Sequence, residues 1–375
     1  MKLRRSVLLV FILTVVLGGT VFGYGAWDEE PAYIPVDVLD EIIADFAANL
    51  ERAMATNAAH PLFIDDLKEH LERLRQLQAA GETGNYGDYA GLSTDPRLPG
   101  ARTAHDVSGI TLAMRLAPAA SFPLGRDDSG VGTVEKPFWI AETPVTYELW
   151  YVVRTWAVAN GYTFRARGQE GVGAVGEPPS SRRREPVTSF SWFDAVVWSN
   201  ALSEMAGLQP VYTYGGAVLR DANDLTAVGN AVQEAGGGFR LPTSVEWELA
   251  ARYQGETRTG GAIGRDGLFW TPGEHPSGSA APASDRAASA AVAWTAENSG
   301  RSTHPVGLKP ANALGLYDMA GNVWEWSFTT DGSNRRIHGG GWAHGVAQLP
   351  LGLVISNAPA TVNFANGMRL VRTAD

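Results

Sequence analysis

Two helical patterns stand near the start of the chain. Apolar side chains recur about every fourth position on both sides of His60-Pro61, and charged side chains occupy the opposite face of the second segment. This spacing places the apolar side chains along one face of a helix. The apolar positions are Val38, Ile42, Phe46, Leu50 and Met54, then Ile64, Leu67, Leu71 and Leu74. We therefore expect a helical hairpin within residues 30–80, which is too small to be a secure domain by itself.

The pattern changes after this hairpin. Residues 81–103 are rich in Gly, Pro, Asp and Thr, which is typical of a linker. Beyond them, short apolar stretches alternate with Gly-rich loops, and long amphipathic patterns become rare. This indicates a larger domain over residues 104–375 that is built from short strands and loops. The 12 tryptophans and 43 glycines suit a loop-rich fold whose core is filled by aromatic side chains.

One helix start can be read from its local chemistry. Thr243 precedes Glu246 with the spacing of a capping box, in which the hydroxyl accepts an N–H of the first turn and the carboxylate reaches back. Trp247 and Leu249 then supply a face to be buried. Glu246 is therefore expected to cap a helix rather than to act as a catalytic acid.

The first 23 residues follow the plan of a secretory signal. Three basic residues precede an apolar run at 7–17, and small residues follow up to a cleavage point after Gly23. An uncleaved N-terminal anchor is the alternative, because the run can be extended almost to the length of a membrane span. Either version places the body outside the cytoplasm, as a periplasmic or secreted protein. Membrane attachment is expected only through this segment, if at all.

Charge and cysteine content narrow the possible functions. The formal net charge of −10 argues against nucleic acid as a partner, because phosphate binding needs a basic face. The 375 residues contain 0 cysteines. Disulfides, thiolate nucleophiles and thiolate metal sites are therefore excluded together.

A series of motifs over residues 107–373 resembles the sulfatase-modifying-factor family, which includes the formylglycine-generating enzymes. The central motif reads Gly315-Leu316-Tyr317-Asp318-Met319-Ala320-Gly321-Asn322-Val323-Trp324-Glu325-Trp326. The supporting blocks occur in the family's order, at 121–125, 138–146, 191–213, 239–252, 298–307, 338–342 and 367–372. The resemblance implies an α+β fold related to C-type lectins, with little regular structure. It also implies that block 191–213 begins with the first helix of this domain, and that block 239–252 holds the second.

The resemblance also implies a structural calcium ion. The family binds calcium through side chains at the positions of Asp318 and Glu325, and through carbonyls at the positions of Gly321 and Val323. Carboxylate and carbonyl oxygens are the ligands that calcium prefers, and an extended segment would aim alternate carbonyls inward. The alternative is that the two acidic residues only cap loops. Asn298 matches the first half of a second family calcium site, whose acidic loop is shortened here.

The catalytic residues of the family are missing. In formylglycine-generating enzymes, two copper-binding cysteines follow a Gly-Gly-Ser-aromatic block, which here reads Gly339-Gly340-Gly341-Trp342. Counting onward, His344 falls at the first cysteine and Leu349 at the second. Copper-thiolate oxidation is therefore unavailable to this chain, and copper is not expected as a cofactor. The His-x-x-x-His-x-Glu motif of iron-dependent relatives is also absent from the sequence.

His344 remains as the candidate catalytic residue. Together with His338 it could hold a metal ion, although no third ligand is evident. The alternative is that both are exposed loop histidines. Trp342 and Arg369 are expected in the core or at strand ends rather than in contact with a substrate.

Two functional hypotheses follow, and they leave open whether the protein is an enzyme. The first is a calcium-braced binding or scaffolding module for a protein or glycan partner, because a lectin-like frame presents loops that can bind after chemistry is lost. The second is a non-heme metal oxidoreductase or protein-maturation enzyme of changed mechanism.

Overall fold

The computed structural model describes residues 99–255 and 261–374. The chain divides between Ala90 and Gly91 into two units, and every described residue belongs to the second. The expected signal segment, the helical hairpin and most of the linker lie outside the described residues. Within 99–255 and 261–374, no helix is both long and apolar enough to cross a membrane.

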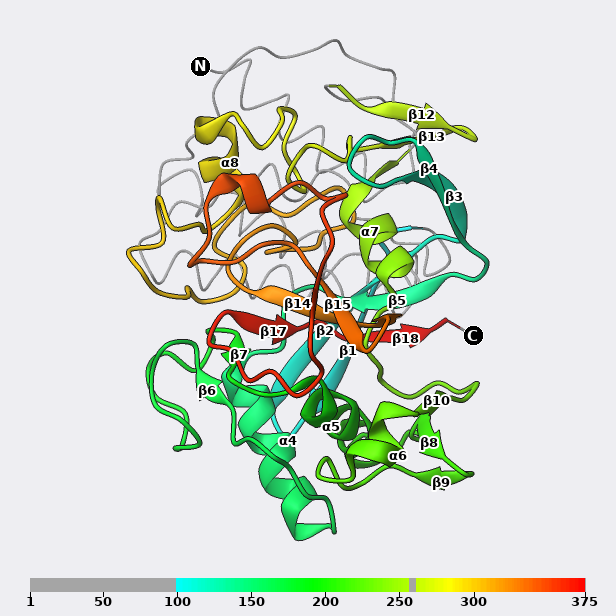
Figure 1. The fold of residues 1–375 in the computed structure, drawn as a ribbon, viewed down its shortest axis with the longest axis vertical. Helices are drawn as coiled ribbons and strands as arrows, with labels where there is room; N and C mark the ends of the chain where they lie inside the picture. Colours follow the sequence, from blue (N-terminus) through cyan, green and yellow to red (C-terminus); the bar gives the residue numbers. More distant parts are fainter. Residues whose placement is uncertain (1–98, 256–260, 375) are drawn as a thin grey trace, which may run out of the picture. The chain divides into compact units, whose positions relative to one another are not determined.

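A four-stranded antiparallel sheet joins the beginning and the end of the described body (Figure 1). In order, its strands are β1 (Arg102–Val107), β2 (Ile110–Ala117), β5 (Phe138–Ala141) and β18 (Val371–Thr373). Ser108 and Gly109 have φ of 54° and 81°, which suits the two-residue turn between β1 and β2. Because β18 pairs with β5, the last strand completes the sheet that the first strands begin.

A second four-stranded sheet carries the central motif. Its order is β16 (Ile355–Asn357), β15 (Asn334–His338), β14 (Trp324–Asp331) and β17 (Asn366–Met368). The β14–β17 pair is parallel, whereas the other two pairs are antiparallel. Glu325 therefore lies opposite His338 on one side and Gly367 on the other. Three distant motifs of the sequence meet at this point.

Short strands complete the β structure. They form the pairs β3 (Ala120–Leu124) with β4 (Gly130–Val134) and β6 (Gln169–Glu170) with β7 (Val187–Thr188). Two three-stranded sheets hold β8 (Tyr212–Tyr214), β9 (Ala217–Val218), β10 (Val232–Gln233), β11 (Tyr253–Gly255), β12 (Ile263–Arg265) and β13 (Leu268–Trp270).

The helices flank the central strands, with α4 and α5 on one side and α7 on the other (Figure 1). The helical elements are α4 (Tyr147–Ala159), α5 (Trp192–Met205), α6 (Leu225–Gly229), α7 (Ser244–Arg252), α8 (Arg286–Val292) and the 3-10 turn η2 (Val346–Gln348). The capping box predicted at Thr243 and Glu246 is present at α7. The helix expected in block 191–213 is α5, but α4 precedes it, so the prediction that α5 is the first helix is wrong.

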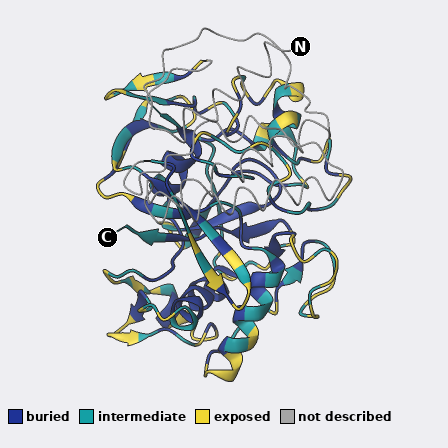
Figure 2. Ribbon diagram, turned by 180° about the vertical axis from the view of Figure 1, so that it is seen from behind, coloured by how far each residue is buried: buried dark blue, intermediate teal, exposed yellow. Residues whose placement is uncertain are grey.

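Tryptophan side chains fill the core, as expected, and Figure 2 shows the buried residues concentrated around the central strands. Within residues 99–255 and 261–374, seven tryptophans are less than 2% exposed: Trp150, Trp192, Trp198, Trp247, Trp270, Trp324 and Trp326. The indole N–H groups of Trp192 and Trp247 donate to Ser327 and Glu325, which fixes β14 between α5 and α7. The α+β fold with short strands and long loops is confirmed, and it positions the central motif in the middle of the body.

Candidate functional site

Three of the four predicted calcium ligands, Asp318, Gly321 and Val323, lie in the loop before β14, and the fourth, Glu325, is the second residue of that strand. Asp318 and Asn322 have φ of 54° and 59°, and Gly321 has φ of 76°. Aspartate, asparagine and glycine enter this left-handed region more readily than other residues. The expectation of an extended segment between the two acidic ligands is therefore wrong. The chain turns through left-handed conformations at these positions before β14 begins at Trp324.

Contacts with the segment 294–304 fix this loop. The Asn322 side chain accepts from the backbone N–H of His304 and donates to its carbonyl, both at 3.1 Å. The backbone N–H of Asn322 donates to the Trp294 carbonyl at 2.9 Å. A Cβ at Gly321 would lie 2.5 Å from that same carbonyl oxygen, so only glycine fits there. The loop is thus held in one conformation by groups other than a metal ion.

Asp318 is a buried carboxylate that forms no ion pair within the described residues. Its Oδ2 accepts from the Gly307 backbone N–H at 2.8 Å, and its Oδ1 accepts from the Asn322 side-chain amide at 3.4 Å. Burial raises the pKa of Asp318 to about 6, above its ordinary value of 3.8. Both hydrogen-bond donors are neutral, and the nearby charge of Arg369 offsets only part of the cost of burying this carboxylate. This is the environment of a group that a bound cation would stabilise.

Glu325 lies in a different electrostatic environment. Its Oε1 accepts from Arg369 Nη2 at 2.8 Å, and its Oε2 accepts from Arg369 Nε at 3.0 Å and from Trp247 Nε1 at 2.6 Å. The same guanidinium donates to the carbonyls of Ala141 and Tyr317 at 2.8 and 2.7 Å. Glu325 and Arg369 are both 0% exposed. The charge of Glu325 is therefore already balanced by an internal cation.

These residues fit a calcium ion, but unequally. The donor set contains only hard oxygens, as calcium requires. Asp318 offers a carboxylate whose charge lacks a partner, whereas the carboxylate of Glu325 is shared with Arg369. Gly321 and Val323 contribute main-chain oxygens of the same loop. The assignment of all four residues stays a prediction, with Asp318 as the member that depends most on the ion.

Asn298, the candidate for a second calcium site, uses its side chain within its own turn. The side-chain oxygen accepts from the Thr295 backbone N–H at 2.8 Å. The side-chain amide donates to the carbonyls of Ala290 and Ala293 at 3.3 and 2.9 Å. Asn298 therefore ties the end of α8 to the next loop, and nothing in its contacts calls for a metal ion.

His338 is not an exposed loop histidine. It ends β15, is 0% exposed, and stacks on Trp247 with ring centroids 4.8 Å apart. Its Nε2 lies 2.8 Å from the Ser244 hydroxyl, and its Nδ1 has no hydrogen-bond partner within the described part of the chain. Burial, aided by Arg336, lowers the pKa of His338 to about 3. A neutral, fully buried imidazole is a packing element, so the metal pair with His344 finds no support.

The buried imidazole predicts acid sensitivity. The pKa of His338 is about 3 in the folded protein and 6.5 when exposed, so the unfolded chain binds a proton here that the folded one does not. Its stabilising contribution is complete above about pH 6.5 and is lost progressively as the pH falls toward 3. We expect His338→Gln, which keeps an amide near Ser244, to lose less stability than the wild type between about pH 7 and about pH 5. Urea unfolding of both proteins measures this difference, and parallel pH profiles would contradict it.

His344 is half-buried and bound to the central motif. Its Nδ1 accepts a hydrogen bond from Trp324 Nε1 at 3.2 Å, and the two rings meet edge to face at 5.8 Å. Burial lowers the pKa of His344. An indole N–H can only donate, so Nδ1 must carry the lone pair and the neutral ring carries its proton on Nε2. His344 therefore offers a donor, not a free lone pair, to an incoming group.

The second cysteine position is occupied by a core residue. Leu349 is 0% exposed and packs with Ala283, Ala293 and Ala320. Gly341, which stands where the family block has serine, lies so close to Trp324 that a Cβ would be 3.2 Å from its ring. The site that holds two cysteines in formylglycine-generating enzymes is thus rebuilt here as a packed Trp324–His344 contact.

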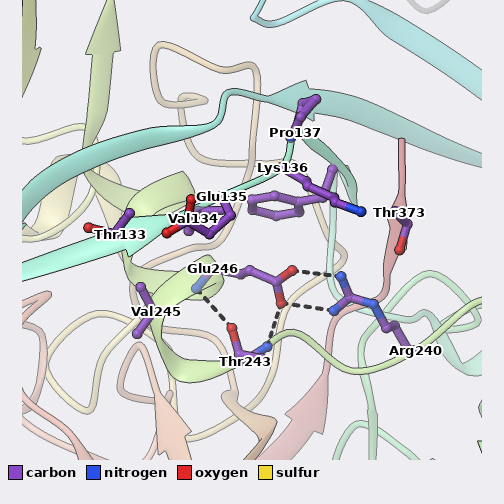
Figure 3. A pocket seen from close by; sticks show the side chains of 11 residues that line it. Thr133, Val134, Glu135, Lys136, Pro137, Arg240, Thr243, Val245, Glu246 and Thr373 are labelled. Atoms are coloured by element: carbon purple, nitrogen blue, oxygen red, sulfur yellow. Dashed lines mark hydrogen bonds and ion pairs between the residues drawn. The ribbon is translucent and has the colours of Figure 1, made fainter. Parts of the chain in front are cut away.

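An open pocket of about 310 Å³ lies at the start of α7, away from the predicted site residues (Figure 3). Two of its charged groups are paired with each other, since Arg240 donates to both oxygens of Glu246 at 2.8 and 2.6 Å. Glu246 also accepts from the Thr243 backbone N–H at 2.8 Å. The capping interpretation of Glu246 therefore accounts for its position in this pocket.

Two features of the site could not be found by reading the sequence. Arg369 was expected in the core or at a strand end, and it is buried, but nothing local announced its ion pair with Glu325. Trp342 was also expected in the core or at a strand end. It lies half-buried in a turn instead, where its ring meets the exposed Phe364 at 5.6 Å.

Comparisons with known proteins agree with this geometry. The profile of the sulfatase-modifying factor enzyme 1-like domain matches residues 113–374. Chaperone protein LppX of Paenibacillus barcinonensis is 33% identical over 192 residues, which cover 46% of this chain and 65% of that protein. Inactive C-alpha-formylglycine-generating enzyme 2 of Mus musculus is 30% identical over 227 residues, covering 56% and 64%. The matched region thus spans just under two thirds of each of these relatives.

Two solved structures resemble the body. Treponema denticola variable protein 1 has a TM-score of 0.54 and 28% identity, over 73% of this chain and 99% of that one. CarF has a TM-score of 0.53 and 30% identity, over 69% and 97%. Because the profile covers nearly all of the described body, including the second four-stranded sheet and the central motif, the chain belongs to the sulfatase-modifying factor enzyme 1-like family, as a member that lacks the catalytic cysteines.

Proposed function

We propose that this protein is an extracytoplasmic binding module that uses the family fold to hold polypeptide partners, without copper-thiolate oxidation. The observation that carries the proposal is the replacement of the family's reactive pair. His344 and Leu349 stand at the two cysteine positions, and the chain has 0 cysteines. At these two positions the chain has a half-buried hydrogen-bond donor, His344, and a packed core residue, Leu349.

The relatives support a binding role and a polypeptide partner. One is named a chaperone and another is named an inactive formylglycine-generating enzyme. These names belong to the relatives alone. They agree with a protein that keeps the family fold but has lost the family's oxidation reaction. The N-terminal signal pattern supports export, and the only partly compensated Asp318 carboxylate supports a calcium brace.

The geometry gives no support to an oxidoreductase that binds a metal ion at His344. The Nδ1 lone pair of His344 accepts the hydrogen bond from Trp324 Nε1–H, and the proton of the neutral imidazole is on Nε2. A metal ligand needs a free ring lone pair. His344 would have to break the Trp324 contact or lose its remaining proton to provide one.

Aggregation measurements test the binding role directly. Reduced insulin, whose B chain aggregates and scatters light, serves as a non-native polypeptide. We expect the full chain to lower the scattering in a concentration-dependent way, with no effect from an equal mass of a well-folded acidic control protein. Scattering that is unchanged at a several-fold molar excess of the protein would overturn the proposed function.

A second measurement tests the loss of the family reaction. Formylglycine formation needs a thiolate to hold copper and to capture the substrate cysteine, and this chain has none. We expect a sulfatase-motif peptide to keep its cysteine after incubation with the protein and copper, at a level equal to that of a protein-free control. A protein-dependent mass loss corresponding to aldehyde formation would contradict this expectation.

A further inference from the structure

We propose that the guanidinium groups of Arg154 and Arg167, with the hydroxyl of Tyr151, form a binding site for a phosphate monoester. Tyr151 and Arg154 lie on α4, and Arg167 belongs to the segment between α4 and β6. In this arrangement the two cations bind the phosphate dianion, and the phenol donates a hydrogen bond to one of its oxygens. This binding activity goes beyond the proposed function and does not depend on it. We call these three residues the 151–167 site.

The three side chains meet on one side of α4. Tyr151 and Arg154 are three positions apart in the helix, so their side chains lie on the same face. Arg167 and Tyr151 both act electrostatically on Arg154, which requires them to be close because solvent screens distant groups. Phe164 packs on Trp150 of the same helix, with ring centroids 6.4 Å apart. The site is therefore assembled from one helix and the segment that follows it.

Arg154 is a half-buried arginine that lacks a carboxylate partner. Its Cζ lies 5.5 Å from the centre of the Phe164 ring, and its buried Nε has no hydrogen-bond partner within residues 99–255 and 261–374. Burial, followed by the charge of Arg167, lowers the pKa of Arg154. An arginine nevertheless stays protonated in proteins. Two like charges at a half-buried position are unfavourable, and an anion bound by both of them would offset that cost.

Asp194 is the acidic residue whose charge acts on Arg154, but its oxygens are already in use. It is 0% exposed. One oxygen accepts from the backbone N–H groups of Arg165 and Ala166 at 2.7 and 3.2 Å, and the other accepts from the backbone N–H and the hydroxyl of Ser191 at 2.9 and 2.5 Å. This carboxylate therefore caps α5 and fixes the segment after α4. It leaves the guanidinium of Arg154 without an ion pair in the described part of the chain.

The main chain and the stem of Arg167 are held in place. Its carbonyl accepts a hydrogen bond from Trp150 Nε1 at 2.9 Å. Its side-chain stem crosses Gly176, where a Cβ would lie 2.5 Å from the Arg167 Cδ. Gly176 has φ of 70° and donates its backbone N–H to the Gly168 carbonyl at 2.9 Å. Arg167 is exposed and forms no ion pair among the residues that the structure describes, so its charge is available to a ligand.

Tyr151 adds a neutral donor. Its ring lies 6.2 Å from the ring of Tyr147, one turn earlier in α4. The Tyr147 hydroxyl donates to the Glu177 carbonyl at 2.7 Å, whereas no hydrogen bond within the described residues uses the Tyr151 hydroxyl. Glu170 and Glu177 carry the negative charges that act on Tyr147. Glu170 is buried and accepts from the backbone N–H and the hydroxyl of Ser180, and Glu177 is exposed to solvent, which screens its charge.

The charge and the number of donors favour a phosphate monoester over other anions. A phosphate monoester carries a charge of about −1.5 to −2 at pH 7 and three strong acceptor oxygens. Two guanidinium groups and one hydroxyl match both numbers, and arginine binds phosphate in bidentate geometry. A carboxylate offers one charge and two oxygens. The net charge of −10 opposes long polyanions such as nucleic acids, so a single monoester group fits the site best.

Calorimetric titration of the full chain with glycerol 3-phosphate tests the site. We expect a dissociation constant on the order of 0.1–1 mM at low salt, and weaker binding as the salt concentration is raised. Acetate, which offers a single carboxylate, should bind at least about 10-fold more weakly. Vesicles of phosphatidylcholine with and without phosphatidic acid identify the source of the monoester, because phosphatidic acid presents the same group on a lipid surface. Binding to phosphatidic acid vesicles alone would assign the group to a lipid, and binding to glycerol 3-phosphate alone would assign it to a soluble ester.

Variants connect the binding to the three residues. Arg154→Met and Arg167→Met should each weaken the binding of the monoester by about 10-fold or more, since each removes a charge-assisted hydrogen bond. Tyr151→Phe should weaken it by about 3-fold. Arg286→Met is the matched control, because it removes the same charge from a side chain on α8 that is 74% exposed. It should leave the binding unchanged.

Thermal melts show whether the variants remain folded and give a second measure of binding. Saturating glycerol 3-phosphate should raise the melting temperature of the wild type and of Arg286→Met, but not that of Arg154→Met. Without the ligand, Arg154→Met should melt at or above the wild-type temperature, because it removes a half-buried charge that lacks a counter-ion.

Three results would overturn the 151–167 site. The first is the absence of binding to both glycerol 3-phosphate and phosphatidic acid vesicles. The second is an equal effect of Arg154→Met and Arg286→Met on the binding, and the third is acetate binding as tight as that of the monoester. None of these results bears on the suppression of insulin aggregation, which tests the proposed function separately.

Discussion

Replacing Arg369 with methionine should destabilise the folded protein by about 3–5 kcal/mol, the usual cost of leaving a buried charge without its partner. Arg369 is 0% exposed and donates to both oxygens of Glu325 and to two carbonyls. Methionine fills similar volume but supplies no donor. Glu325 would keep only the Trp247 N–H. Urea unfolding followed by tryptophan fluorescence measures the loss.

Two further variants make this prediction specific. Arg126→Met removes an arginine whose pair with Glu274 is about half-exposed, so it should cost less than about 1 kcal/mol. The double variant Glu325→Gln with Arg369→Met removes the unpaired charge and should be more stable than Arg369→Met alone. If Arg369→Met loses no more stability than Arg126→Met, the pair does not brace the central motif as we infer.

The structural features that were predicted well from the sequence are those that depend on neighbouring residues alone. Thr243 and Glu246 lie three residues apart, and their capping box depends on nothing else in the chain. The order of the motifs predicted the family, and the resemblance to the family predicted the α+β fold. Helix α4 was missed because Tyr147–Ala159 is rich in Tyr, Trp and Val, which favour strands locally. Packing against α5 decides its conformation instead.

The site depends on contacts between residues far apart in the sequence. His338 is buried because Ser244, 94 residues away, and the neighbouring Trp247 meet it across the fold. Glu325 and Arg369 are 44 residues apart. No pattern within a short window reports such pairs. The left-handed turns at Asp318 and Asn322 were also missed, although Asp and Asn are the residues that tolerate them.

A fold with so little regular structure can be braced from inside by two kinds of cation, a buried arginine side chain or a bound metal ion. Arg252 provides a second example of the arginine kind, since it is 0% exposed and lies between Glu248 and Asp128. It also donates to the carbonyls of Pro123 and Gly125. Arginine therefore holds loops at two separate points. Asp318, in contrast, is a buried carboxylate that forms no ion pair with an arginine in the part of the chain that the structure describes.

We expect calcium to stabilise the protein through Asp318. A ligand present at about 100 times its dissociation constant adds about 2.7 kcal/mol, which corresponds to roughly 5–10 °C in melting temperature for a domain of this size. Asp318→Asn should abolish this shift. In chelator, the variant should be at least as stable as the wild type, because it removes a buried and only partly compensated charge. Thermal melts with calcium and with chelator measure both effects.

Asp266→Asn is the matched control for this experiment. Asp266 also has a left-handed conformation, with φ of 53°, but its side chain is 71% exposed in the β12–β13 turn. The same substitution there should leave the calcium shift intact. Glu325→Gln is less informative, because it unpairs Arg369 and destabilises the protein whether or not calcium is bound. A melting temperature that does not respond to calcium in the wild type, or a shift that survives in Asp318→Asn, would show that this carboxylate is compensated by something other than the ion.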